Sequence, residues 1–331
     1  MEKAIPLSVL DLASVQEGKT IADAFRNTVA LAQHTEKLGY RRFWMAEHHN
    51  LPGIASAATS VLLGHVAGKT STIRVGSGGI MLPNHSPLVI AEQFGTLETL
   101  YPGRIDLGLG RAPGSDQVTM RAVRRVPIET DFGELVEELQ SYFLPTRTGQ
   151  KVAAIPGAGL PIPLWILGSS LYSAELAARL GLPYAFAGHF APDMMMQAFA
   201  IYHREFFPSK VLSKPQTMVC VQGIAAETDE KAQFLATTLY QRFLGIIRND
   251  RSQSKAPVEN MDAIWSDAEK HHIHSTFRYA VIGGPERVKQ TLRALVRETR
   301  ADEVMICSEL YALDDRLRSF EILAEQNAGL N

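Results

Sequence analysis

The chain has 331 residues, of which 46% are hydrophobic and 21% charged, so it can bury a sizeable core and does not have the composition of a disordered protein. Its 33 Lys and Arg residues nearly balance its 35 Asp and Glu residues, and a net charge of -2 gives no basic surface for nucleic acid or an anionic membrane. No apolar run approaches the roughly 18 residues of a membrane-spanning helix, and the first residues lack the apolar core of a signal peptide, so we expect a cytoplasmic protein.

Short apolar segments that predict strands alternate along the chain with longer amphipathic segments that predict helices. The predicted strands cover residues 5–11, 41–47, 72–80, 104–110, 163–168, 184–189, 217–226 and 302–308. The predicted helices cover residues 20–39, 55–70, 86–100, 115–142, 169–181, 192–207, 230–245, 284–299 and 312–327. Residues 246–277 are polar and show no clear period, so we expect an irregular insertion there that could act as a lid.

Most of the eight predicted strands are apolar throughout, as parallel strands are when helices cover their outer face. Helices between nearly every pair favour an α/β fold of the (β/α)8 TIM-barrel class, with residues 1–331 in a single domain. An open, doubly wound sheet is the rival, but it would divide the chain into halves, and no linker-like composition separates two halves. The two cysteines, Cys220 and Cys307, lie in predicted strands, and we expect reduced structural thiols.

In this fold the chemistry lies at the carboxyl ends of the strands. Polar residues and glycines concentrate at these predicted ends, whereas the opposite ends carry no comparable residues. The residues at the carboxyl ends are Asp11, Glu47, His48, His49, 76–79, 108–111, Gly168, Ser169, Ser170, Gly188 and His189.

A metal site is one interpretation, because Glu47, His48, His49, His85 and His189 could converge at one mouth of the barrel. Adjacent histidines on a regular strand point to opposite faces, however, and the sequence contains neither an HxH pair nor an HExxH helix. We therefore predict no metal site. A metal-dependent barrel hydrolase that uses three of these histidines stays an alternative from another functional class.

The glycine-rich segment 108–114 suggests a dinucleotide loop, but its spacing differs from GxGxxG and no acidic residue ends a second strand about 20 residues later. We therefore do not expect a Rossmann site. The glycines still indicate close approach of the backbone, either to a flat ligand or between a strand and a loop.

The segment after the fifth predicted strand is more specific. Gly168 ends the strand, Ser169 and Ser170 open a helix, and Ser173 follows one turn later, so free N–H groups and hydroxyls could bind an anion. A simple serine N-cap explains the same residues equally well. Arg111, at the end of the neighbouring strand, favours a phosphate. Together with the glycine-lined end of the third strand and an imidazole from the second, this pattern describes a flavin mononucleotide (FMN) site.

Three segments resemble the bacterial luciferase-like family of flavin-dependent monooxygenases: AEHHN at 46–50, the block at 75–114, and LGSSLYSAELAARLGLP at 167–183. The resemblance implies reduced FMN supplied by a separate NAD(P)H:flavin reductase. It also implies that O2 reacts at flavin C4a to give a hydroperoxide that oxygenates a small organic substrate. A homodimer is implied as well, and the small residues at 55–68 could form part of its interface.

The resemblance also implies roles for individual residues. The phosphate would be bound by Arg111, Gly168, Ser169, Ser170 and Ser173. The flavin ring would lie over Ser77, Gly78 and Gly79, and the two glycines match a pair that forms a cis peptide bond in relatives. His48 matches the active-site histidine, and we expect Glu47 and His49 to orient it.

Two positions depart from luciferase itself. Gly110 stands where luciferase has a reactive cysteine, and Ser169 stands where it has a glutamate, so the resemblance does not imply light emission or a long-chain aldehyde substrate. Two alternatives share the fold: an oxidoreductase that transfers hydride with the deazaflavin F420, and a non-catalytic flavin-binding protein.

Overall fold

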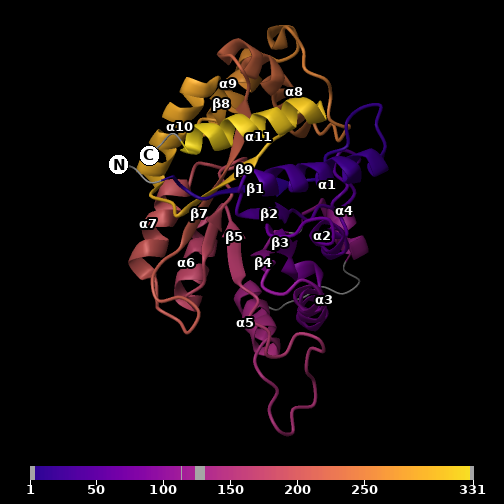
Figure 1. Cartoon of the computed structure of the whole chain (residues 1–331), viewed down its shortest axis with the longest axis vertical. Coiled ribbons are helices and arrows are strands. Elements are labelled where there is room, and N and C mark those ends of the chain that lie inside the picture. Colours follow the sequence, from indigo (N-terminus) through magenta and orange to yellow (C-terminus); the bar gives the residue numbers. More distant parts are fainter. Residues whose placement is uncertain (1–3, 113, 124–130, 329–331) are drawn as a thin grey trace.

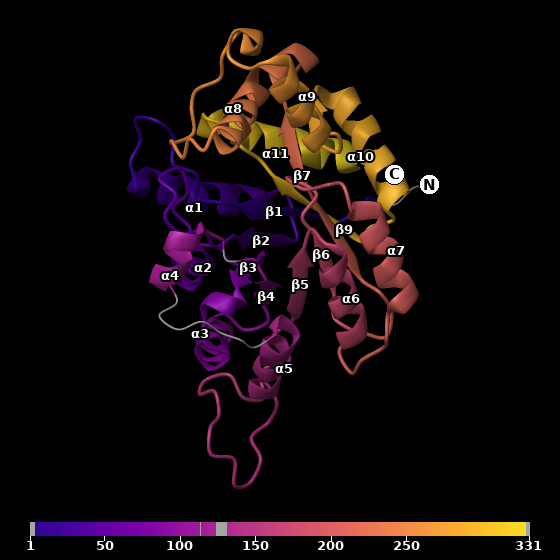
Figure 2. The ribbon, with the colours of Figure 1, turned by 180° about the vertical axis from the view of Figure 1, so that it is seen from behind.

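The computed structural model describes residues 4–112, 114–123 and 131–328, in which eight parallel strands form a closed ring surrounded by helices (Figures 1 and 2). The ring consists of β1 (Leu7–Asp11), β2 (Arg42–Met45), β3 (Arg74–Met81), β4 (Ile105–Gly110), β5 (Leu164–Gly168), β6 (Tyr184–Phe186), β7 (Thr217–Ala225) and β9 (Glu303–Cys307). It closes because β6 pairs with β7 and β9 lies between β7 and β1. The predicted (β/α)8 barrel is confirmed.

The helices follow the strands in chain order, and none in the described residues is both long and apolar enough to cross a membrane. They are α1 (Ile21–Lys37), α2 (Thr59–Ala67), α3 (Pro87–Leu100), α4 (Gln117–Val123), α5 (Phe132–Tyr142), α6 (Leu171–Leu180), α7 (Met195–Glu205), α8 (Asp229–Ile247), α9 (Asp267–Thr276), α10 (Pro285–Thr299) and α11 (Leu313–Ala328), with short 3-10 turns η1 (Leu82–Asn84) and η2 (Met261–Ala263). The connection between α5 and β5 projects away from the barrel in both views (Figures 1 and 2).

Two predictions about the elements are wrong. The single helix expected over 115–142 is divided into α4 and α5, with residues 124–130 outside the described part of the chain. The segment 246–277, expected to be irregular, contains α9, which starts with a capping box between Ser266 and Glu269. Only one α9 residue, Ile273, is buried, so the helix has no apolar stripe that a sequence pattern could show. A short strand, β8 (Val281–Gly283), was also missed; it pairs with the end of β7 outside the ring.

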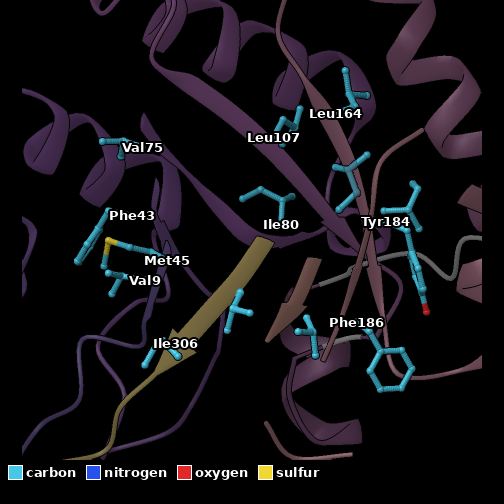
Figure 3. Close-up of a cluster of buried hydrophobic side chains, with 14 of the residues drawn as sticks. Val9, Phe43, Met45, Val75, Ile80, Leu107, Leu164, Tyr184, Phe186 and Ile306 are labelled. Carbon is cyan, nitrogen blue, oxygen red and sulfur yellow. The ribbon is translucent and has the colours of Figure 1, made fainter. Parts of the chain in front are cut away.

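Both faces of the barrel strands are buried, which explains their uniformly apolar sequences. Val9, Phe43 and Ile306 belong to the large cluster between the strands and the helices (Figure 3). Leu10 and Trp44, their neighbours in sequence, belong to a separate cluster, as the alternation of side chains along a strand requires. This second cluster forms the interior of the barrel.

Charged residues lie buried at the amino-terminal ends of the strands. The sequence did not predict a cluster of polar residues at these ends. Arg42 donates to Asp106 at 2.6 Å through one guanidinium nitrogen and to Glu303 at 3.0 Å through Nε. Arg74 also donates to Asp106, at 2.6 Å, and the Ser8 hydroxyl donates to Glu303. Five strands, β1, β2, β3, β4 and β9, are thus joined by one buried network.

Replacement of Arg42 by leucine should destabilise the protein strongly, because Asp106 and Glu303 would keep buried charges without their shared partner. We expect Arg42→Leu to lower the free energy of unfolding by about 3–5 kcal/mol, measured by denaturant titration. The exposed Arg318, paired with Glu227, is the control, and Arg318→Gln should cost no more than about 1 kcal/mol. Equal losses in the two variants would contradict a structural role for the network.

Candidate active site

A cavity of about 850 Å³ opens at the carboxyl ends of the barrel strands, which is a size suited to a cofactor and a small second ligand. Its wall includes α8 and residues 249–253 of the segment that follows it. Most of the predicted site residues line it: His48, Gly78, Gly79, Arg111, Gly168, Ser169, Ser170 and Ser173. Three predicted residues, Glu47, His49 and Ser77, do not line it.

The amino terminus of α6 forms one end of the cavity. Ser170 is the N-cap residue, with extended backbone, but its side chain makes no capping hydrogen bond to the helix. The first amides of α6 therefore lack the side-chain acceptor that a simple serine N-cap would provide. Ser169 and Ser170 are both partly exposed on the cavity wall. The arrangement is suited to an oxyanion such as phosphate.

Arg111 is held beside this helix end by an aromatic ring. Its guanidinium lies 4.5 Å from the ring centroid of Tyr172, in the first turn of α6. The Tyr172 hydroxyl donates to Asp131 at 3.1 Å, and burial together with this bond raises the pKa of Tyr172. Tyr172 was not among the predicted site residues, although its position two residues after Ser170 places it on the helix turn that faces Arg111.

Ser173 supports the helix end from within. Its hydroxyl donates to the Ser170 carbonyl at 2.7 Å and lies 3.1 Å from the Tyr184 hydroxyl. A Cβ atom at Gly168 would lie 2.2 Å from the Ser173 hydroxyl oxygen, so only glycine fits there. The expected role of Ser173 as a direct phosphate ligand is therefore weakened, because protein groups already occupy its hydroxyl.

The end of β3 presents bare backbone to the cavity. The Gly78–Gly79 peptide bond is cis, as the resemblance implied, and the register between β3 and β4 shifts at this point. A Cβ atom would lie 2.7 Å from the Leu10 side chain at Gly78 and 2.7 Å from the Gly108 carbonyl at Gly79. Ser77 instead joins the two strands, because its hydroxyl donates to the Gly108 carbonyl at 2.8 Å. Ser77 is thus placed as a structural residue.

Glu47 is buried behind the cavity and does not orient His48 through a hydrogen bond, contrary to expectation. Its carboxylate is hydrogen-bonded to the Nε2 atoms of His49, at 2.8 Å, and His85, at 2.9 Å, and accepts from the Met81 N–H at 2.9 Å. Burial raises the pKa of Glu47, but the hydrogen bonds outweigh burial and hold this pKa below its usual value. Glu47 therefore ties the end of β2 to the turn after β3.

Two imidazoles on the cavity wall are neutral at physiological pH. Burial lowers the pKa of His48, and the nearby charge of Arg242 lowers it further against a hydrogen bond with the Gly114 backbone. Burial, aided by His48, lowers the pKa of His189 to about 3. The Nδ1 atom of His189 and the Oε1 atom of Gln222 are buried without a protein hydrogen-bond partner in the described residues. Both atoms can accept from a ligand.

The described residues contain no group of three or more His, Cys, Asp or Glu side chains arranged to hold a metal ion. His49 and His85 turn toward Glu47, whereas His48 and His189 belong to the cavity. The alternative of a metal-dependent hydrolase therefore lacks a ligand set in this part of the chain.

His189 should make stability fall in acid. Its folded pKa of about 3 lies below the unfolded value of about 6.5, so between these values the unfolded chain binds a proton that the folded protein does not. From about pH 6.5 to about pH 5, this group should remove about 2 kcal/mol from the free energy of unfolding. His189→Asn should lose this part of the pH dependence in denaturant titrations. Phe190→Leu, which alters the ring beside His189, is the control and should keep it.

Comparisons with known proteins show the family to which the chain belongs. Residues 6–303 match the family described as luciferase-like monooxygenase. A protein of Escherichia coli strain K12 called luciferase-like monooxygenase is 51% identical over 97% of this chain and 96% of its own. The uncharacterised protein YvbT of Bacillus subtilis strain 168 is 57% identical over 96% of each chain.

Solved structures show the same fold. The structure of apo-MsnO8 has a TM-score of 0.88 and 35% identity, and the alignment covers 97% of this chain and 98% of that one. More distant structures include the oxygenating constituent of a diketocamphane monooxygenase from Pseudomonas putida in complex with FMN, with a TM-score of 0.75, 17% identity and 98% of both chains covered. An F420-dependent secondary alcohol dehydrogenase has a TM-score of 0.66 and 14% identity, with 98% of both chains covered. The chain belongs to the luciferase-like monooxygenase family.

Proposed function

We propose that this protein is a two-component monooxygenase that binds reduced FMN and uses O2 to oxygenate a small organic substrate. A separate NAD(P)H:flavin reductase would supply the reduced FMN. The observation that carries the proposal is the uncapped amino terminus of α6 beside Arg111, at one end of a cavity that continues to Gly78, Gly79 and His48.

The residues present fit FMN. The α6 amides, the hydroxyls of Ser169 and Ser170 and the guanidinium of Arg111 would hold the phosphate. Gly78 and Gly79 present backbone to the cavity, and the flat ring system would lie against this part of the wall. Reduced FMN, when bound, supplies the two electrons with which one oxygen atom of O2 is transferred to substrate and the other leaves as water.

The chain's own side chains would protect this chemistry from solvent and manage a proton. Leu10, Trp44, Leu167 and Met305 line the cavity toward the barrel interior and exclude water there. His48 is neutral at pH 7, so its ring can both accept and donate a hydrogen bond next to the flavin. A neutral imidazole in a dry cavity can move a proton without leaving a buried charge behind.

An F420-dependent hydride transfer is the second candidate, because a structure with the same barrel fold binds an F420 adduct. Both cofactors carry a flat tricyclic ring and a phosphate, so the same end of the cavity suits either. Affinity decides between them: a preference for F420 over FMN would replace the monooxygenase proposal.

We also propose that the protein is a homodimer. The helix α2 carries Val61 on its surface, 71% exposed, and α3 ends at Leu100, 62% exposed. α2 and α3 are neighbours in the outer layer of the barrel, and a second copy that packs on these two helices would cover both apolar side chains.

The phosphate end of the cavity can be tested with paired ligands. Arg111→Gln should weaken FMN binding roughly tenfold to a hundredfold, because a charge-assisted hydrogen bond is worth about 1.5–3 kcal/mol. Riboflavin lacks the phosphate, and its affinity should stay unchanged, as measured by quenching of flavin fluorescence. Tyr172→Phe keeps the ring beneath Arg111 and is the matched control. Equal losses for FMN and riboflavin would contradict a phosphate role for Arg111.

The role of His48 can be tested by mixing protein, loaded with reduced FMN under anaerobic conditions, with oxygenated buffer. We expect bound FMN to reoxidise more slowly than free FMN and through a spectrally distinct phase, because the dry cavity protects it. His48→Ala should shorten that phase, whereas His49→Ala, which leaves the cavity wall intact, should preserve it. Reoxidation at the rate of free FMN in the wild type would contradict the proposed monooxygenase.

A further inference from the structure

Arg242, on α8, lines the same cavity and was not anticipated from the sequence. Its side chain is only 14% exposed, yet its guanidinium donates no hydrogen bond to any protein group among the described residues. The nearest carboxylate, Glu309, lies 3.7 Å from Nε, which is an ion-pair distance but too long for a hydrogen bond. A guanidinium carries five N–H donors, so this largely buried group has directional donors to offer a ligand.

Glu309 pairs with Arg242 by charge without accepting a hydrogen bond from it, and it also lines the cavity. It is 3% exposed, and its two oxygens accept from the Ser14 hydroxyl at 3.0 and 3.3 Å. On the other side, the charge of Arg242 is felt at His48, whose pKa it helps to lower, so the positive field of the guanidinium extends into the cavity.

The other cationic side chains on the cavity wall, among the described residues, already have partners. Arg251 donates to Asp116, and Lys255 lies 3.4 Å from Asp250. Arg111 stacks on Tyr172 at the phosphate end. Among the described residues, Arg242 and Arg111 are therefore the two cations of this wall whose guanidinium groups donate no hydrogen bond to protein, and Arg111 belongs to the phosphate end.

The position of Arg242 separates it from the phosphate end. Its partner Glu309 follows β9, whereas Arg111 follows β4. In the closed ring, β9 and β4 are four strands apart in either direction, so they lie on opposite sides of the mouth. Phe243 and Ile246, on the same helix as Arg242, add apolar wall beside it. The cavity thus has a guanidinium at each of two ends, that of Arg242 being paired with Glu309, and an apolar and imidazole-lined region between them.

We propose that Arg242 binds a carboxylate of the organic substrate, so that the substrates of this enzyme are organic acids with an apolar body. This inference rests on the proposed function, because it assigns the carboxylate to the substrate of that monooxygenase. The acid group would be held at the β9 side, and the apolar part would extend past His48 toward the cofactor.

The test uses matched pairs of an acid and its primary amide, octanoate with octanamide and phenylbutanoate with phenylbutanamide. Binding is measured by calorimetry with protein saturated with FMN and with protein alone. We expect the wild type to bind each acid at least about tenfold more tightly than its amide. Arg242→Gln should abolish the difference, and Arg242→Lys should retain part of it. Arg251→Gln removes a cation of the same wall that is already paired, and it should leave the difference unchanged.

Three results would overturn the inference. One is a wild type that does not discriminate between acid and amide, including one that binds neither member of the pairs. Another is discrimination that survives in Arg242→Gln. The third is a loss of FMN and riboflavin affinity in Arg242→Gln, which would make Arg242 a contact of the flavin ring. Failure of the proposed function would give a different result. FMN would not bind, whereas the preference for acid over amide would still be lost in Arg242→Gln.

Discussion

The buried ion network around Arg42 determines where this barrel can hold a ligand. Arg42 joins Asp106 and Glu303, and its guanidinium also lies 5.0 Å from the ring centroid of Trp165. Trp165 in turn packs edge-on against Trp44 at 5.5 Å. These groups fill the amino-terminal half of the barrel interior with charge and aromatic rings. A large cavity lies at the other end of the ring, at the carboxyl ends of the strands.

The wall of that mouth presents backbone groups as much as side chains. The α6 amides, the bare peptide of Gly78 and Gly79, and the Gly114 backbone beside His48 all contribute groups that no side chain replaces. Backbone groups are fixed by the strands and helices that carry them, so they bind without losing side-chain rotamer entropy. The side chains then supply what backbone cannot, namely positive charge and a titratable imidazole.

The parts of the structure that depend on local pattern could be predicted from the sequence. The eight barrel strands and the serines at the start of α6 belong to short segments whose composition indicates their structure. The misjudged parts depend on distant residues. Glu47 was expected to orient its neighbour His48. Its hydrogen-bond partners are instead His49 and His85, and His85 lies 38 positions away in the sequence. Arg242 looked like an ordinary helix residue because its relation to Glu309, 67 positions later, exists only in the folded chain.

The two imidazoles explain why the opposite cationic ends can share one cavity. A protonated His48 between Arg111 and Arg242 would add a third positive charge in a region with little water, and burial and Arg242 both oppose that charge. Burial and the neighbouring His48 lower the pKa of His189 to about 3, so this ring is also neutral. The lowered pKa values of His48 and His189 therefore keep added positive charge out of the region between Arg111 and Arg242. Under the two proposals, an anionic cofactor would be held at the Arg111 end and an acid at the Arg242 end, and the uncharged parts of the two ligands would meet between them.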